Sequence, residues 1–251
     1  GGVDLRGFRK AVVMERNQLI ETVTREVLAI LGTGGEAALG LDHADEAVAN
    51  GAARLGFSGN GSDVPAGLAQ YIDHTILKPD VPPEKIDTLC DEAMEYQFAA
   101  VCINPVWVRR AASRVRGSGV KVASLLGFPL GANLPEIKAM EARRAIRNGA
   151  REIDMVLNIG ALKSGDDALV LRDIRAVVED CVDGNAVCKV IIETALLSDD
   201  EKRRASELAK IARAHFVKTS TGFSTGGATV VEREHHEPLL GQLGRIRHVY
   251  A

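Results

Sequence analysis

The sequence carries little net charge. Its 251 residues include 31 Lys and Arg against 34 Asp and Glu, which leaves a net charge of −3 and a pI near 6.1. Proteins that bind nucleic acid or anionic membranes usually present a basic field, and this composition does not provide one. We therefore expect neither nucleic acid nor a membrane surface as a partner.

Long apolar runs are also absent. No stretch approaches the roughly 20 apolar residues that a membrane-spanning helix needs. Residues 1–16 lack the basic and then apolar order of a secretory signal. These two absences predict a cytoplasmic protein.

Cysteine is scarce, and its spacing does not suggest a metal site. The four cysteines are Cys90, Cys102, Cys181 and Cys188, with no C-x-x-C pair. We expect reduced, mostly buried thiols rather than a zinc site or a disulfide framework. The segment Glu234-His-His-Glu237 lacks H-E-x-x-H spacing, and adjacent histidines diverge on a helix or a strand. The sequence therefore predicts no metal and no other cofactor.

From about residue 66 the sequence repeats one unit, a short apolar run followed by a longer helical stretch. Strand followed by helix at this spacing, without hairpin signals, predicts an α/β fold with a parallel sheet. The predicted strands are residues 70–76, 98–104, 120–127, 151–157, 188–194 and 216–220.

Two of the predicted helices have recognisable ends. Asn133 with Glu136, and Ser198 with Glu201, have the spacing of capping boxes. Gly149 is placed to end the first of these helices.

Residues 1–64 differ in character and predict a helical N-terminal extension. An amphipathic helix is expected over residues 15–31, followed by a glycine-rich linker. The helix resembles the encapsulation helices that dock enzymes inside bacterial microcompartments. Residues 15–32 therefore either contact a microcompartment shell or cargo, or form an ordinary docking or dimerising helix.

Lys218 lies in a short apolar strand that runs into a turn rich in Thr, Ser and Gly. A lysine in a half-buried site loses part of its preference for the charged form, and the free amine condenses with carbonyls to a Schiff base. The alternative is a strand-end lysine whose charge reaches solvent. Polar residues also recur on single faces of the other strands, and a core buries charge only with partners. The polar positions expected on this face are Asp73, Thr75, Cys102, Asn104, Asp154, Lys189, Glu193, Lys218 and Ser220.

Six blocks of the sequence, in order, closely resemble deoxyribose-phosphate aldolases, over about residues 68–230. Because six separate motifs agree in order, the resemblance does not depend on any one of them. The blocks are Tyr71-Ile-Asp-His-Thr-Ile-Leu-Lys-Pro79, Val101-Cys-Ile-Asn-Pro105, Gly127-Phe-Pro-Leu-Gly-Ala-Asn133, Glu152-Ile-Asp-Met-Val156, Lys189-Val-Ile-Ile-Glu-Thr194 and Val217-Lys-Thr-Ser-Thr-Gly222.

The resemblance implies a TIM (β/α)8-type barrel that needs no metal and reversibly splits 2-deoxyribose 5-phosphate into glyceraldehyde 3-phosphate and acetaldehyde. By the same resemblance Lys218 is the Schiff-base lysine and Asp154 is the acid/base residue. Lys189 would keep Asp154 ionised and disfavour the ammonium form of Lys218.

Five further positions match pocket-lining or substrate-binding positions of that family. The five positions are Asp73, Thr75, Cys102, Thr221 and Gly222. For Asp73, Thr75 and Cys102, as for Lys189, the alternative is an ion pair or core contact without a chemical step.

The resemblance ends near residue 230, and the tail 231–251 diverges. The family continues with two more strands that bring a second lysine and phosphate-binding turns, whereas residues 230–251 contain no lysine. We therefore expect an incomplete barrel of six or seven strands over residues 65–230. Without the second lysine we expect a weaker proton relay and a low rate. Without the phosphate-binding turns we expect weaker phosphate binding, and Phe223 also stands where the family often has a basic residue.

Two other interpretations remain open at this stage. In the first, the chain is a catalytically silent aldolase-like scaffold that binds a partner. In the second, it is a related aldolase that acts on an unphosphorylated aldehyde. An open sheet edge and an exposed amphipathic helix favour a homo-oligomer, located in the cytoplasm or inside a microcompartment.

Overall fold

Six short apolar segments form one curved parallel sheet in the computed structural model, which describes residues 68–227. All of these residues fall within one compact unit. Each strand pairs in parallel with the next strand along the chain. The strands are β1 (Asp73–Ile76), β2 (Ala100–Ile103), β3 (Lys121–Leu126), β4 (Glu152–Val156), β5 (Val187–Ile191) and β6 (Phe216–Lys218).

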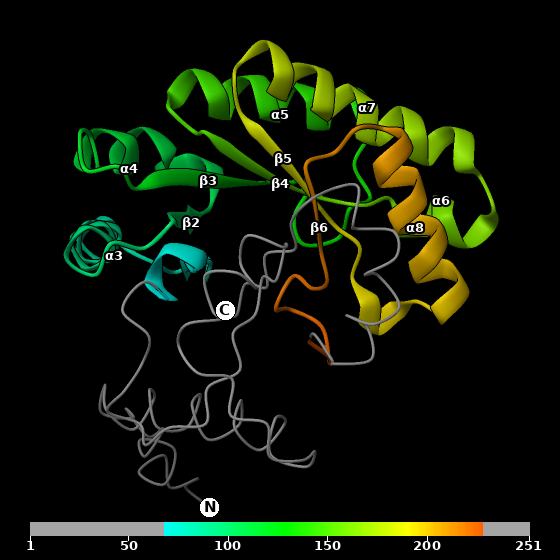
Figure 1. Cartoon of the computed structure of the whole chain (residues 1–251), viewed down its shortest axis with the longest axis horizontal. Helices are drawn as coiled ribbons and strands as arrows, with labels where there is room; N and C mark the ends of the chain where they lie inside the picture. The colour runs from blue at the N-terminus through cyan, green and yellow to red at the C-terminus, as the bar shows by residue number, and fades with distance from the viewer. Residues whose placement is uncertain (1–67, 228–251) are drawn as a thin grey trace, which may run out of the picture. The chain divides into compact units, whose positions relative to one another are not determined.

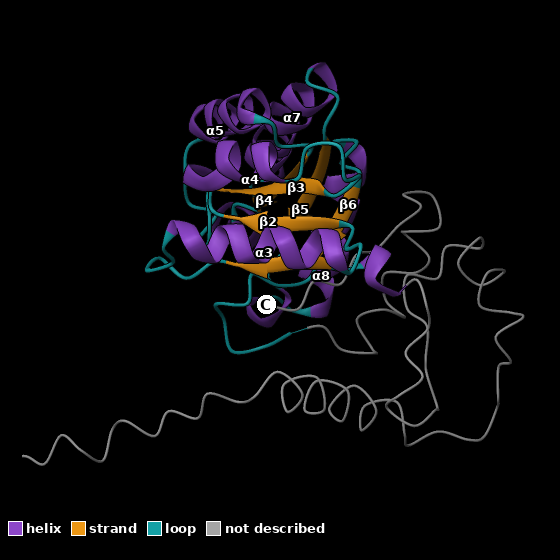
Figure 2. Cartoon of the chain, turned by 90° about the vertical axis from the view of Figure 1, so that its left-hand side faces the viewer, coloured by secondary structure: helices purple, strands orange, loops and turns teal. Residues whose placement is uncertain are grey.

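Helices connect the strands and cover the convex side of the sheet (Figures 1 and 2). Helix α5 packs along α7, and α7 in turn contacts α8. The α-helices are α3 (Pro83–Glu95), α4 (Val108–Arg114), α5 (Pro135–Asn148), α6 (Ile159–Ser164), α7 (Asp167–Asp183) and α8 (Asp199–Ile211), and single 3-10 turns are η3 (Leu68–Tyr71), η4 (Pro105–Trp107) and η5 (Thr194–Leu196).

The two faces of the sheet have different surroundings because side chains alternate along each strand. One face packs against the helices and forms the main apolar core, in which each fully buried Val, Leu or Ile contributes about 1.5–3 kcal/mol. Its strand residues include Val101, Ile103, Ile153, Met155 and Val190. The other, inner face carries a smaller apolar cluster of Ala100, Cys102, Ala123, Leu125, Val156 and Ile191.

This architecture confirms the predicted α/β fold as a half-barrel of the TIM type. The first strand is shorter than predicted, because residues 68–71 form the 3-10 turn η3 and Ile72 N donates to Ala69 O at 3.0 Å. The sixth strand also ends early, at Lys218.

One of the two predicted capping boxes is present. Ser198 accepts from Glu201 N, and Glu201 reaches back to Ser198 N. The box at Asn133 is wrong, since the N-cap of α5 is Leu134, without a side-chain cap. Pro135 forces the residue before it into the extended conformation, so the helix begins at Pro135 and Asn133 lies one position too early. Gly149 ends α5 as predicted, with φ at 114°.

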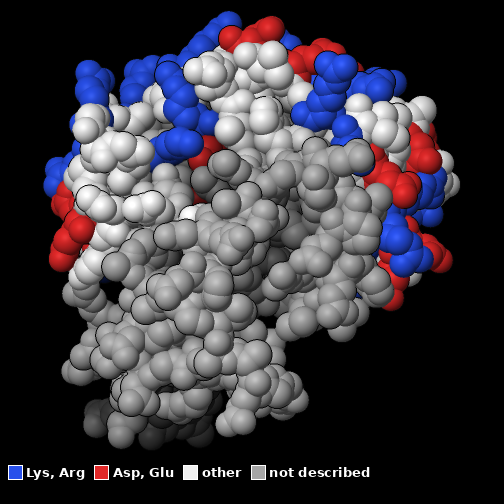
Figure 3. Space-filling view, in the orientation of Figure 1, with Lys and Arg blue, Asp and Glu red and all other residues white. Residues whose placement is uncertain are grey.

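Several predictions lie outside the described residues. These are the helix over residues 15–31 with its microcompartment contact, the domain boundaries at 64/65 and 230/231, the tail 231–251 and the segment 234–237. Within residues 68–227, no helix is long and apolar enough to cross a membrane. Basic and acidic side chains are interspersed on the described surface in the view of Figure 3.

Candidate active site

Lys218 is the last residue of β6, and its side chain is buried. Only 5% of the residue is exposed to solvent. Its Nζ donates to Asp154 Oδ2 at 2.6 Å. The charge of this lysine therefore does not reach solvent, in contrast to the strand-end alternative.

Asp154 lies in the middle of β4 and is fully buried. Its Oδ1 is 3.1 Å from Lys189 Nζ, a charge contact outside hydrogen-bond geometry. Burial alone would raise the pKa of Asp154, but the charges of Lys189 and Lys218 outweigh burial and lower the pKa below its ordinary 3.8. Asp154 is therefore an ionised carboxylate in contact with both amines at neutral pH.

Lys189 lies on β5, beside Asp154 in the register of the sheet, and is also fully buried. Its Nζ is 2.7 Å from Asp73 Oδ2 and 2.7 Å from Glu152 Oε2. Burial lowers the pKa of Lys189, but the three surrounding carboxylates reverse this effect and raise the pKa well above 10.5. Lys189 is therefore a permanent cation that holds three carboxylates together.

Glu152 belongs to this cluster, and the sequence reasoning missed it. It lies two residues before Asp154 on the same face of β4 and is 1% exposed. Lys121 Nζ, half-exposed on β3, approaches its other oxygen at 3.7 Å. The signal was present, because an acidic residue at an inward position of a buried strand requires a cationic partner.

Thr75 and Cys102 lie on the first two strands beside this cluster. The Thr75 hydroxyl donates to Asp73 O at 2.8 Å. Cys102 is fully buried in the inner-face apolar cluster. Burial raises the pKa of its thiol to about 12, so the thiol stays protonated at neutral pH.

Thr221 and Gly222 lie in the turn that follows β6. The Thr221 amide donates to Glu193 Oε2 at 3.2 Å, and the Thr221 hydroxyl donates to the same oxygen. Gly222 has a φ of 82°, in the left-handed region that favours glycine. This turn is therefore tied to the carboxyl end of β5 through Glu193.

Asn104 follows β2 with a backbone that is still extended, and it donates its amide to Leu77 O at 3.0 Å. The predicted alternation fails beyond the end of β5. Glu193 was predicted to share the face of Lys189, but it follows the end of β5 with a left-handed φ of 55° and contacts Thr221 instead. A period of two holds only where the backbone stays extended.

The arrangement brings a lysine and a carboxylate together in a buried site at one end of a parallel sheet. Such a pair supports carbonyl condensation at the amine and proton transfer through the carboxylate. Among the described residues, no group of three or more His, Cys, Asp and Glu side chains could hold a metal ion.

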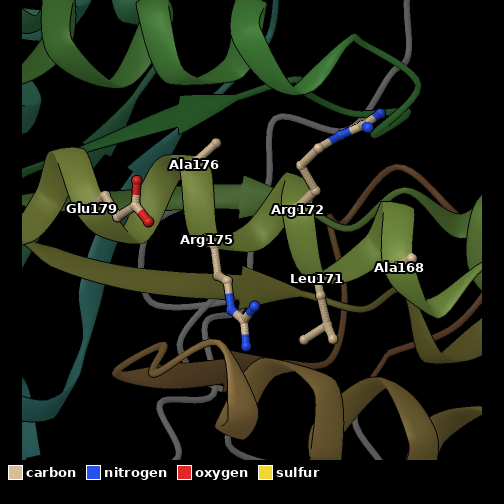
Figure 4. Close-up of a pocket in the computed structure, with 6 residues that line it drawn as sticks. All are labelled: Ala168, Leu171, Arg172, Arg175, Ala176 and Glu179. Carbon is tan, nitrogen blue, oxygen red and sulfur yellow. The ribbon is translucent and has the colours of Figure 1, made fainter.

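A separate hollow of about 460 Å³ lies along the outer face of α7 (Figure 4). Leu171 and Arg175 point from α7 toward α8 in this view, and Arg172 points the other way. All of its lining comes from one helix of the outer layer. It is therefore distinct from the Lys218 site on the inner face.

Comparison with known proteins points to one enzyme family. The family model described as DeoC/LacD family aldolase matches residues 68–238, eight residues further than the resemblance found in the sequence. A deoxyribose-phosphate aldolase from Listeria innocua is 61% identical over 162 residues, which are 64% of this chain and 72% of that protein. One from Listeria welshimeri is 57% identical over 175 residues, or 70% of this chain and 78% of that protein.

Solved structures show the same relationship. The tetrameric deoxyribose phosphate aldolase from Aeropyrum pernix superposes with a TM-score of 0.68 at 31% identity, covering 81% of this chain and 82% of that chain. A structure described as QR15, an aldolase, matches with a TM-score of 0.67 at 35% identity, covering 71% and 79% of the two chains.

Proposed function

This chain belongs to the DeoC/LacD family of aldolases, and from that premise we propose that it is a deoxyribose-phosphate aldolase. It reversibly cleaves 2-deoxy-D-ribose 5-phosphate to D-glyceraldehyde 3-phosphate and acetaldehyde, as a lyase of the Schiff-base type. The observation that carries the proposal is the contact of Lys218 Nζ with Asp154 Oδ2 at 2.6 Å inside a buried site.

Lys218 forms the covalent bond to substrate. Its ammonium first gives a proton to Asp154, and the free amine attacks the aldehyde carbon of the open-chain sugar. The carbinolamine hydroxyl takes up that proton and departs as water, which leaves an iminium ion. The C2–C3 bond then breaks, its electron pair moves toward the iminium to form an enamine, and glyceraldehyde 3-phosphate departs. Protonation of the enamine carbon and addition of water release acetaldehyde and restore the amine.

Asp154 moves the protons of these steps. It accepts the proton of the C3 hydroxyl as the C2–C3 bond breaks and returns a proton to the enamine carbon. General acid–base catalysis of this kind contributes about 10²–10⁴-fold in rate. The lowered pKa of Asp154 keeps the carboxylate in the form that accepts a proton.

Lys189 holds Asp154 rather than bonding to substrate. Its ammonium contacts Asp73, Glu152 and Asp154 at once, so it fixes the carboxylate that faces Lys218. In this proposal Thr75 and Cys102 line the inner face, while Thr221 and the backbone of Gly222 meet the phosphate end of the sugar.

Borohydride trapping tests the proposal. Acetaldehyde and sodium borohydride should leave an ethyl group on Lys218, located by peptide mass spectrometry, and Lys218→Ala should lose the adduct together with cleavage activity. Lys163→Ala is a matched control, because Lys163 lies half-exposed on α6 and pairs with Glu201. A folded wild-type chain without an adduct at Lys218 would overturn the proposal and favour a silent scaffold.

The partners follow from the same proposal. We propose phosphosugar and aldehyde substrates, a homo-oligomeric state supported by the tetrameric relative from Aeropyrum pernix, and the cytoplasm as location. Residues 65–230 form the aldolase unit between the extension 1–64 and the tail 231–251. The contact of residues 15–32 of this chain with a microcompartment shell or cargo stays a prediction.

A further inference from the structure

Two phenylalanine rings meet across the carboxyl end of the sheet. The ring centroids of Phe128 and Phe223 are 5.3 Å apart, with the planes at 89°, an edge-to-face contact. Phe128 follows the end of β3 and Phe223 follows the end of β6. Since β4 and β5 lie between these strands, the contact spans the ends of the strands that carry Asp154 and Lys189.

The position of Phe128 is fixed by its turn. Gly131 N donates to Gly127 O at 2.7 Å, and Gly127 N donates to Glu141 Oε2 at 3.0 Å. The backbone at Gly131 lies so close to β4 that an added Cβ would stand 1.9 Å from Leu157 O. The turn is therefore closed by its own hydrogen bond, tied to α5 through Glu141 and packed tightly against Leu157, the residue after β4.

The Phe128 ring lies on the inner side of the sheet. It packs against the inner-face apolar cluster, which includes Ile191. Ile191 is the register partner of Lys218 in the pairing of β5 with β6. The ring therefore packs against the same inner-face cluster that contains the register partner of Lys218.

The position of Phe223 is fixed by a buried network. Its amide donates to Thr221 Oγ1 at 3.1 Å, and Thr221 is in turn bound by Glu193. Thr221 and Glu193 are 5% and 3% exposed, whereas 53% of Phe223 is exposed. The exposed ring of Phe223 is thus held in place by the buried contact between Thr221 and Glu193.

We propose that Phe128 and Phe223 form an aromatic wall over Lys218 and that this wall determines which aldehydes the enzyme accepts. The proposal rests on the proposed function. An aldehyde condensed with Lys218, the last residue of β6, lies at the carboxyl end of the sheet, where the two rings follow β3 and β6. Unbranched small aldehydes fit beneath the wall, whereas a branch next to the carbonyl collides with a ring.

A ratio of two trapping rates tests the wall. Borohydride trapping on Lys218 is measured with acetaldehyde and with isobutyraldehyde in the same preparation, so the folded fraction of the protein cancels. Phe128→Leu and Phe223→Ala should each lower the preference for acetaldehyde about tenfold, the size of effect that one or two methyl groups have in a pocket. Leu130→Ala is the control, because Leu130 lies in the same turn as Phe128 and is 74% exposed.

The outcomes separate the two proposals. A preference that is unchanged in both phenylalanine variants, with Lys218 still labelled by acetaldehyde, would overturn the wall and leave the aldolase intact. The absence of any adduct on wild-type Lys218 would overturn both. If the rings act through their mutual contact, the double variant should change the preference by less than the product of the two single effects.

Discussion

Asp154 is the residue on which both amines of the site converge. Lys218 contacts one of its oxygens at 2.6 Å, and Lys189 lies 3.1 Å from the other. Because its pKa is lowered by these charges, the ionised form stabilises the fold above pH 3.8, and that stabilisation is lost as the pH falls through the folded-state pKa.

A titration of Asp154 checks this electrostatic balance. In the intact chain its pKa should lie below 3.8. Lys189→Met removes one of the two charges that oppose burial, so the pKa of Asp154 should rise. A ¹³C NMR titration of labelled aspartate carboxyl groups measures both values. Lys121→Met is the control, since Lys121 approaches Glu152 and not Asp154; equal pKa values of Asp154 in wild type and Lys189→Met would contradict this view.

The residues of the site could be predicted from the sequence only in part. Lys218, Asp154 and Lys189 stand out because each is a charged residue inside an apolar strand. Glu152 was missed although it shares the inward face of β4 with Asp154 and carries the same signal, a charged side chain inside a buried strand. Glu193 was misplaced because its left-handed backbone ends the alternation, which no sequence pattern showed.

Helices α5 and α7 are joined by a buried ion pair outside the active site. Lys138 Nζ donates to Asp173 Oδ2 at 2.6 Å and to Val156 O at 2.9 Å, and both side chains are 0% exposed. Burial raises the pKa of Asp173 and lowers the pKa of Lys138. For each group burial outweighs the attraction between them, so neither charge is favoured by folding.

Removing one partner of this pair should lower the free energy of unfolding more than replacing both partners by apolar residues. Lys138→Met leaves the Asp173 carboxyl buried without its cation, and the free energy of unfolding should fall by about 3–5 kcal/mol. Lys138→Met with Asp173→Leu replaces both groups by apolar ones and should regain most of that loss. Urea denaturation of the two variants measures the difference, and an equally unstable double variant would refute this balance.

The ends of two helices offer a matched pair of cap variants. Ser198→Ala removes the cap of α8 and should lower the free energy of unfolding by about 1 kcal/mol. Asn133→Ala should change it by less than about 0.5 kcal/mol, because Asn133 does not cap α5. Both values come from denaturant unfolding; equal losses would show that Asn133 acts as a cap after all. The sequence pattern was the same at both sites, and Pro135 made the difference.

At the scale of the whole molecule, the sheet could be predicted well. Short apolar runs separated by amphipathic helices predict parallel strands that follow one another, and the observed order is the order of the chain. The register could not be predicted. The pairing of Asp154 with Lys189 depends on how the packed helices set one strand against the next, and short strands leave several registers compatible with the pattern.

Because each strand pairs with the one before it, every pairing in the sheet spans a single strand–helix unit, and the sheet can grow from β1 onward as the chain is synthesised. The ion pair between Lys189 and Asp73 is different, since it joins positions 116 residues apart. Each earlier unit can thus pair as soon as it emerges, while the charge cluster stays incomplete until the fifth strand arrives. The active site is therefore completed late in the folding of this enzyme, and its completion depends on the pairing of all the earlier strand–helix units.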